Sequence, residues 1–314
     1  MIKERIKRFL KKFKLTLISE YDVKRKENYK EILEKIILSS PRFESEKCSI
    51  IIFSKDRALQ LEALLRSFYF FSKNPPKVYV LYNSSKIEFG QAYDEVAEEY
   101  KSRNIEFINE VNFRKELISL FNKVDTTKVL FLVDDLMFKN TIDFEDFSKI
   151  DTTKYIGSLR MGNHLTFSYT VQKPQNTPNF ITTKEHQGML LWHFYKEQLD
   201  WAYPLSVDGH LFSTGEIKVL VNELDYKAPN SFEEALQLMT PLYQQRMGLC
   251  YKESVIINNP CNKVQLENNN IAGQVSISEL NEKWTQGFRI NFVEHKGILN
   301  ESAHQELSLS FVKR

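Results

Sequence analysis

The sequence predicts an α/β fold built on a doubly wound, mostly parallel sheet, and three observations support this prediction. The chain has 314 residues, 42% of them hydrophobic, which suffices for one large domain or two smaller ones. From Cys48 onward, short β-branched runs alternate with runs of helical periodicity. Residues 129–133 are apolar throughout, as expected of a central strand covered on both faces.

The elements of the first half follow a strand–turn–helix order. The run "CSIIIF" predicts a strand that ends at the polar turn Ser54-Lys55-Asp56, and a helix with leucines on its buried side follows. This order is typical of a Rossmann-like, nucleotide-binding sheet. We expect a strand at 48–53, a helix up to 71, a strand and turn at 77–85, a helix at 91–101, a strand at 105–110, a helix at 113–124 and a strand from 128.

The chain divides into three predicted parts. Residues 1–47 predict a basic amphipathic helix, a polar helix and a linker, and residues 48–150 predict the nucleotide-binding half. After residue 150, strand-like pieces such as "YIGSL" and "GMLLWHF" are separated by loops. Residues 151–314 are therefore expected to form a mixed α/β half.

The formal net charge of +2 is unevenly distributed. Residues 1–15 hold seven basic residues and one acidic residue, a charge of +6, so the other 299 residues sum to −4. A slightly acidic body excludes a nucleic-acid binder that uses one broad basic face. In residues 1–17 an apolar stripe lies opposite a cationic face, which favours contact with an anionic membrane surface. A helix docked on the body would show the same pattern.

The three cysteines, Cys48, Cys250 and Cys261, are widely spaced and show no CxxC motif. This spacing argues against disulfides and against a structural zinc site. The N-terminal segment lacks the apolar run of a signal peptide, and no stretch approaches 18 consecutive apolar residues. We therefore expect a cytoplasmic protein, peripheral at the inner membrane face if residues 1–17 bind lipid.

Two carboxylates, Asp134 and Asp135, follow the fourth strand. Ligands of open α/β sheets bind at the carboxyl ends of the strands. Neighbouring side chains of a strand point in opposite directions, so one carboxylate can face a ribose while the other coordinates a divalent metal that bridges a diphosphate. The alternative is that both are solvated residues of a polar loop.

Three segments, "SIIIFSKDR", "VYVLYNSS" and "LFLVDDLMF", together resemble glycosyltransferases of the GT-A fold, of the bacterial family 2-like type. The resemblance covers about residues 48–140. It implies a nucleotide diphosphate sugar donor and a divalent metal, Mn²⁺ or Mg²⁺, at a "DXD" motif. Here the motif reads Val133-Asp134-Asp135, so both aspartates are candidate metal ligands and we prefer Asp135. The expected donor-binding residues are Ser54, Asp56, Arg57, Asn83, Ser84, Lys115 and Asp134, with Arg114 beside Lys115 as a further candidate for the phosphates.

Aromatic residues gather around an Asp-Gly-His motif in the second half. Sugar rings stack on aromatic side chains, so Trp192, Trp201 and Tyr203 predict a site for a glycan or lipid-linked acceptor, although such residues also fill protein cores. His210 is a further acceptor-site candidate, either as a metal ligand or as a structural histidine.

Asp208 lies 73 residues beyond Asp135. In several inverting GT-A enzymes an acidic residue at the start of a helix, at about this distance, is the general base, so the resemblance favours Asp208 as the base and inversion as the outcome. An N-cap or an Asx turn with Gly209 is the alternative. Other candidates for the base are Glu216, Glu233 and Glu234; Asn262 and Gln265 are candidates for sugar hydroxyls, and the final fifty residues contain no chemical motif.

Together these features predict a metal-dependent glycosyltransferase that moves a sugar from a nucleotide diphosphate sugar to a glycan or lipid-linked glycan. A nucleotidyltransferase is one alternative, although "FSKDRALQ" lacks the Gly-rich loop expected after its first strand. A non-catalytic, membrane-associated adaptor that binds a nucleotide or a sugar is another.

Overall fold

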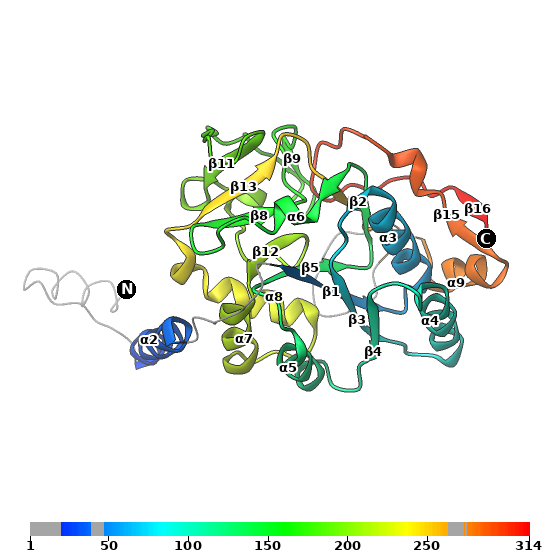
Figure 1. Ribbon diagram of the computed structural model, residues 1–314, viewed down its shortest axis with the longest axis horizontal. Coiled ribbons are helices and arrows are strands. Elements are labelled where there is room, and N and C mark those ends of the chain that lie inside the picture. Colours follow the sequence, from blue (N-terminus) through cyan, green and yellow to red (C-terminus); the bar gives the residue numbers. More distant parts are fainter. Residues whose placement is uncertain (1–19, 39–46, 263–272, 274) are drawn as a thin grey trace, which may run out of the picture.

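An eight-stranded sheet organises the computed structural model, which describes residues 20–38, 47–262, 273 and 275–314. Helices cover both faces of this sheet (Figure 1). The strands lie in the order β11 (Met189–His193), β13 (Met247–Tyr251), β8 (Tyr155–Ser158), β12 (His210–Ser213), β5 (Lys128–Val133), β1 (Cys48–Lys55), β3 (Lys77–Asn83) and β4 (Ile105–Asn109).

The sheet is parallel at one end and mixed at the other. β5, β1, β3 and β4 form a parallel block, whereas β12 is antiparallel to both of its neighbours, β5 and β8. Beyond it, β8 and β13 are parallel, and β11 is antiparallel to β13. The predicted α/β class with a doubly wound, mostly parallel sheet is therefore confirmed, as is the mixed second half.

The helices between the parallel strands lie where the sequence predicts them. One difference is that the first turn of the second helix begins at residue 87 rather than 91. A second is that the residues after the acid pair do not continue the fourth strand, because they turn away and pair with a strand from the second half. These elements are α3 (Ala58–Phe71), α4 (Ile87–Tyr100), α5 (Phe113–Lys123), β6 (Leu136–Phe138) and its partner β14 (Ile256–Asn258).

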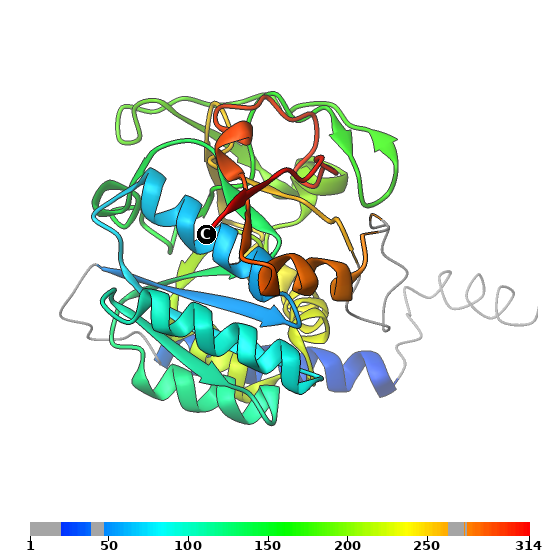
Figure 2. The same cartoon turned by 90° about the vertical axis from the view of Figure 1, so that its right-hand side faces the viewer.

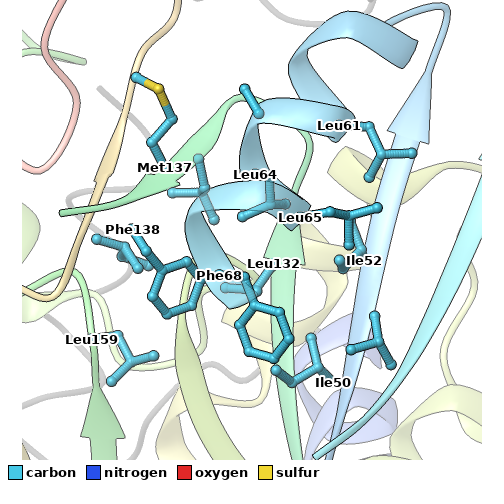
Figure 3. Close-up of a cluster of buried hydrophobic side chains, with 14 of the residues drawn as sticks. Ile50, Ile52, Leu61, Leu64, Leu65, Phe68, Leu132, Met137, Phe138 and Leu159 are labelled. Carbon is cyan, nitrogen blue, oxygen red and sulfur yellow. The ribbon is translucent and has the colours of Figure 1, made fainter. Parts of the chain in front are cut away.

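Two hydrophobic cores lie on the two faces of the sheet, because alternate residues of each strand point to opposite sides. Ile50 and Ile52 of β1 belong to the core under α3, whereas Ile51 and Phe53 belong to the core on the other face. Figure 3 shows Ile50 and Ile52 near Phe68 on the α3 side. Burial on both faces explains the unbroken apolar runs of these strands.

The remaining helices complete both layers. The chain returns at its C-terminus to α3, where the last long helix and the strand after it pack (Figure 2). These elements are α7 (Thr214–Glu223), α8 (Pro229–Leu238), α9 (Ile277–Thr285), β15 (Phe288–Ile290) and β16 (Phe311–Lys313), with short pieces β2 (Ser72–Lys73), β7 (Ile142–Asp143), α6 (Phe144–Phe147), β9 (Phe167–Ser168) and β10 (Lys173–Pro174).

Helix α2 (Glu20–Leu38) packs beside α7 (Figure 1). Ile32 is fully buried there, Tyr29 Oη donates to Leu238 O at 2.7 Å, and Lys35 Nζ donates to Glu223 Oε2 at 2.7 Å. The basic segment at residues 1–17 lies outside the described residues. Among the described helices, none is both long and apolar enough to cross a membrane.

The indole ring of Trp192 in β11 packs directly against the backbone of Gly248 in β13. The two residues are paired in the sheet, and a Cβ atom added to Gly248 would lie 2.2 Å from Cζ2 of the Trp192 ring. Only glycine therefore leaves room for the indole.

We predict that Gly248→Ala lowers the free energy of unfolding by about 1–3 kcal/mol, because the new methyl group overpacks the core against Trp192. Urea unfolding measures the loss. The double variant Gly248→Ala with Trp192→Phe serves as the control, and part of the loss should be recovered in it because the smaller ring leaves space. An alanine variant as stable as the parent would contradict this packing.

Candidate active site

The acid pair lies in the turn between β5 and β6, at the carboxyl end of the parallel block. Asp134 is 4% exposed, and its backbone N–H donates to Phe53 O of β1 at 3.2 Å. Asp134 Oδ2 accepts from Ser54 Oγ at 2.9 Å and from the Lys55 backbone N–H at 3.0 Å. The end of β1 therefore holds this carboxylate in place.

One buried arginine joins the two carboxylates. Arg57 Nη1 lies 2.9 Å from Asp134 Oδ1 and 2.9 Å from Asp135 Oδ2, and Nη2 donates to Asn262 O at 2.6 Å. The other oxygen of Asp135 accepts from Asn258 Nδ2 at 2.7 Å. All four carboxylate oxygens of the pair thus accept hydrogen bonds.

The residue before Arg57 has an unusual backbone conformation, and the Arg57 side chain reaches the acid pair that follows β5. Asp56 has a φ of +56°, a region that non-glycine residues rarely adopt. Two hydrogen bonds to the loop after β3 hold it: Asp56 N donates to Asn83 O at 3.1 Å, and Ser85 N donates to Asp56 Oδ1 at 2.6 Å. The predicted donor-binding residues Asp56, Asn83 and Arg57 are thus brought to one edge.

Tyr93 of α4 forms hydrogen bonds with residues at the end of β1 and in the loop that follows it. Its hydroxyl accepts from Arg57 N at 3.0 Å and lies 2.5 Å from Ser54 Oγ. Ser54 donates to a carboxylate of Asp134, which only accepts, so Tyr93 donates to Ser54. A chain of donors therefore runs from the Arg57 backbone through two hydroxyls to Asp134.

Asp208 lies in the turn before β12, not at the start of a helix as the resemblance implied, because α7 begins six residues later at Thr214. The turn is fixed by Gly209, which has a φ of +76° and donates from its N–H to Phe131 O of β5 at 2.7 Å. Asp208 is consequently anchored beside the strand that carries the acid pair.

Two cationic or proton-donating side chains contact Asp208 Oδ2: His304 Nε2 at 3.1 Å and Arg160 Nη1 at 3.5 Å. Burial raises the pKa of Asp208, but the hydrogen bond from His304 and the charges of His304 and Arg160 outweigh it, and the net pKa lies below the ordinary value. Asp208 is therefore ionised at neutral pH, as a general base must be.

The two carboxylate groups are linked through the C-terminal half. Asn258, which donates to Asp135, forms a backbone bridge with His304, which contacts Asp208. Burial, as the largest cause, raises the pKa of Asp135 to about 6, with Asp134 and Asp208 adding to the rise while the charges of Arg57 and His304 oppose it. Asp134, Asp135 and Asp208 thus share one edge of the sheet.

The prediction that Trp192 and Trp201 present their rings to an acceptor sugar is wrong. Trp192 and Trp201 are 1% and 0% exposed, and Trp192 Nε1 donates to Trp201 O at 3.0 Å inside the core. A fully buried ring offers no face to a sugar. Tyr203 is half-buried, and the charges of Asp208 and Glu233 act on its hydroxyl, so only this aromatic residue of the predicted set lies near Asp208.

His210 is a structural histidine in this fold. It is fully buried in β12, and its Nδ1 donates to Pro204 O at 2.8 Å, while Nε2 has no hydrogen-bond partner among the described residues. Burial, assisted by the charge of Arg160, lowers the pKa of His210 to about 3. The histidine that contacts the candidate base is His304 instead.

Of the remaining predicted donor-binding residues, one lies at this edge of the sheet and the others lie on α5. Ser84 follows β3 near Asn83, whereas Lys115 is exposed on the first turn of α5, and no hydrogen bond among the described residues joins its side chain to the acid pair. Arg114 donates to Asn222 O and Leu224 O of the α7 region, so it ties two helices together.

The alternative bases differ in their surroundings. Glu216 forms a two-pronged ion pair with Arg246, at 2.7 and 2.6 Å, and is not free to accept a proton. Glu233 accepts from Ser206 Oγ and Val207 N beside Asp208, and burial, followed by the charge of Asp208, raises its pKa. Glu234 is exposed on α8. Of the two candidates for sugar hydroxyls, the Asn262 side-chain amide has no hydrogen-bond partner among the described residues, and Gln265 lies outside the described residues.

The comparison with curated proteins gives one relative. The bifunctional glycosyltransferase pgtA of Dictyostelium discoideum is 27% identical over 199 residues, which cover 58% of this chain and 26% of that protein. The chain is similar to a glycosyltransferase. It spans about a quarter of the length of the curated relative, and no protein-family model matches it. The predicted resemblance to glycosyltransferases is thereby confirmed.

Two solved structures with partial similarity are TarS and a mannosyltransferase. TarS of S. aureus in complex with UDP shares 14% identity at a TM-score of 0.45, over 67% of this chain and 59% of that one. The mannosyltransferase PcManGT from Pyrobaculum calidifontis, in complex with GDP-Man and Mn²⁺, shares 11% identity at a TM-score of 0.30, over 48% and 51%. Likeness at these scores carries no conclusion about the ligands of this chain.

The acid pair does not fit the predicted divalent metal in this conformation. A metal would need oxygens of Asp135 and Asp134, and these oxygens accept from Arg57, Asn258, Ser54 and a backbone N–H. Within the described part of the chain, no group of three His, Cys, Asp or Glu side chains is close enough to hold a metal ion. The guanidinium carries the positive charge that was expected of the metal.

Four residues of this edge carry no motif that singles them out in the sequence: Tyr93, Arg160, Asn258 and His304. His304 falls in the final fifty residues, which contain no chemical motif, and the structure places it in contact with Asp208. Only its residue type was a signal, since a histidine often pairs with a catalytic carboxylate.

We predict that acid destabilises the fold through His210. The unfolded chain takes up a proton near pH 6.5 and the folded chain does not until about pH 3, so the free energy of unfolding falls as pH drops below 6.5. Between pH 6.5 and 5 this one group contributes up to about 2 kcal/mol. Urea unfolding at pH 7.5 and 5 should show a smaller difference for His210→Asn. The half-buried His193→Gln is the control, and an unchanged pH difference in His210→Asn would contradict the assignment.

Proposed function

We propose that this chain transfers a sugar from a nucleotide diphosphate sugar to a hydroxyl group of a glycan or lipid-linked glycan, with inversion at the anomeric carbon. The observation that carries this proposal is the meeting of two carboxylate groups, the Asp134–Asp135 pair and Asp208, at one edge of the sheet. A donor-activating group and a base are what a single displacement requires. The similarity to a curated glycosyltransferase supports the same reaction class.

The donor would bind over the carboxyl ends of β1, β3 and β5. Asp56, Asn83 and Ser84 are the candidates for the base and ribose, because they lie at the carboxyl ends of β1 and β3. Ser54, Arg57 and Asp134 fix the edge beneath the diphosphate. Pre-formed hydrogen bonds among these residues reduce the reorganisation that donor binding demands.

Asp208 would act as the general base. Its carboxylate accepts the proton of the acceptor hydroxyl while the hydroxyl oxygen forms a bond to the anomeric carbon. The bond from that carbon to the diphosphate oxygen breaks, and its electron pair leaves with the nucleoside diphosphate. His304 and Arg160, both in contact with Asp208 Oδ2, keep the carboxylate ionised and oriented before the reaction.

The predicted metal, Mn²⁺ or Mg²⁺, takes part in no step of this proposal, because both oxygens of Asp135 accept hydrogen bonds from Arg57 and Asn258 and the guanidinium lies between the two carboxylates. The acceptor class and the membrane-face location rest on the basic segment at residues 1–17 and on the predicted resemblance. Of the predicted acceptor residues, Tyr203 alone is kept, since it lies near Asp208.

We predict that Asp208→Asn lowers kcat by about 10²–10⁴-fold, because the amide cannot take the hydroxyl proton. Release of nucleoside diphosphate and product mass, screened over donor sugars, measure turnover. Nucleotide affinity should be unchanged, since Asp208 lies on the acceptor side. Glu185→Gln, which alters a carboxylate with a 54% exposed side chain in the same half, should retain full activity.

Full turnover in Asp208→Asn would refute the role of the base. Nucleotide binding with no turnover in the parent chain, for any donor tested, would favour the adaptor alternative. Transfer of a nucleotidyl group instead of a sugar would favour the nucleotidyltransferase.

We predict that the intact chain floats with vesicles containing anionic phosphatidylserine and that a chain lacking residues 1–20 does not. Each basic residue near such a surface contributes about 1 kcal/mol. Neutral phosphatidylcholine vesicles and 0.5 M salt are the controls, because both remove the electrostatic attraction. Equal flotation of the two chains would contradict membrane binding through this segment.

A further inference from the structure

Arg57 lies where a cation shared by two carboxylates must lie. Its Nη1 atom is 2.9 Å from an oxygen of Asp134 and 2.9 Å from an oxygen of Asp135. A single nitrogen bridges the two carboxylates, so a metal ion that bridged the same two oxygens, Asp134 Oδ1 and Asp135 Oδ2, would have to occupy the place of the guanidinium. Two positive ions cannot share that place in a site with so little water.

The Arg57 residue is also held in place by burial and by further hydrogen bonds. It is 8% exposed, its Nη2 donates to Asn262 O, and its backbone N–H donates to Tyr93. The left-handed conformation of Asp56 fixes the direction in which the chain enters α3. Withdrawal of the guanidinium would leave two buried carboxylates uncompensated, which is strongly unfavourable.

The charges at this edge nearly balance without a metal. Asp134, Asp135 and Asp208 give −3, and Arg57 and Arg160, which pair with them, give +2, leaving −1. A free acid pair of −2 needs a divalent ion before it can receive an anionic diphosphate. With Arg57 in place the pair carries −1, so half of the charge that such an ion would neutralise is already compensated.

We infer that Arg57 is the resident counter-ion of the acid pair and that this chain binds its nucleotide donor without a divalent metal. The inference rests on the proposed function for the identity of the donor. It departs from the metal dependence that the sequence predicted, and it gives Arg57 the role of a positioning residue that neutralises the pair.

The experiment is calorimetric titration of the full chain with UDP, GDP and CDP, in EDTA and in 1 mM Mn²⁺. We expect the nucleotide that binds to show Kd values within about threefold of each other in the two buffers. Arg57→Gln should weaken binding at least tenfold in EDTA, and Mn²⁺ should restore it, because the vacated carboxylates become a metal site. Arg57→Lys, which keeps the charge, should behave more like the parent. The exposed Arg103→Gln is the matched control.

A second readout separates the inference from the proposed function. Electron paramagnetic resonance of Mn²⁺, without nucleotide, should show no stoichiometric binding by the parent chain and new binding by Arg57→Gln. Tenfold tighter nucleotide binding with Mn²⁺ in the parent chain, or stoichiometric Mn²⁺ binding by it, would overturn the inference. If no nucleotide binds in either buffer, the proposed function fails and the resonance result alone decides the role of Arg57. If Arg57→Gln does not fold, the parent chain and Arg57→Lys decide it by the same criteria.

Discussion

A buried cation between two carboxylates is the interaction on which this edge of the sheet depends. Asp134 and Arg57 are 4% and 8% exposed, so both charges are largely removed from water. Such a pair is stable only when its remaining donors and acceptors are satisfied, and removal of one partner typically costs about 3–5 kcal/mol. Arg57 lies in the loop after β1 and Asn258 lies in β14. Because both donate to the acid pair, their hydrogen bonds join segments that are far apart in the chain.

The strain at Asp56 and the position of Arg57 belong to one arrangement. A left-handed non-glycine residue costs about 1–3 kcal/mol and persists where its surroundings fix it. Here Asn83, the last residue of β3, accepts from the backbone N–H of Asp56, and Ser85, in the loop after β3, donates to the carboxylate of Asp56. The parallel pairing of β1 with β3 places that loop beside the turn, so the sheet register supplies the hydrogen bonds that hold the arginine.

The sequence predicts the parallel block and the acid pair because both are local signals. Apolar runs such as residues 129–133 and the polar turn at residues 54–56 identify strands and their ends without tertiary information. The contact of His304 with Asp208, 96 residues apart, has no such local signal. Aromatic composition also does not distinguish a core residue such as Trp192 from a sugar platform, since both uses favour the same side chains.

Charge balance explains how three carboxylates occupy one edge, although Asp134 and Asp208 add to the rise in the pKa of Asp135. Asp134 and Asp135 share Arg57, whereas Asp208 has Arg160 and His304. Each group thus contacts its own arginine, and the hydrogen bond from His304 together with the charges of His304 and Arg160 keeps the pKa of Asp208 low despite burial. The base of the proposed transfer must stay ionised beside an acid pair, and a separate arginine for each group, Arg57 and Arg160, meets that requirement within the fold itself.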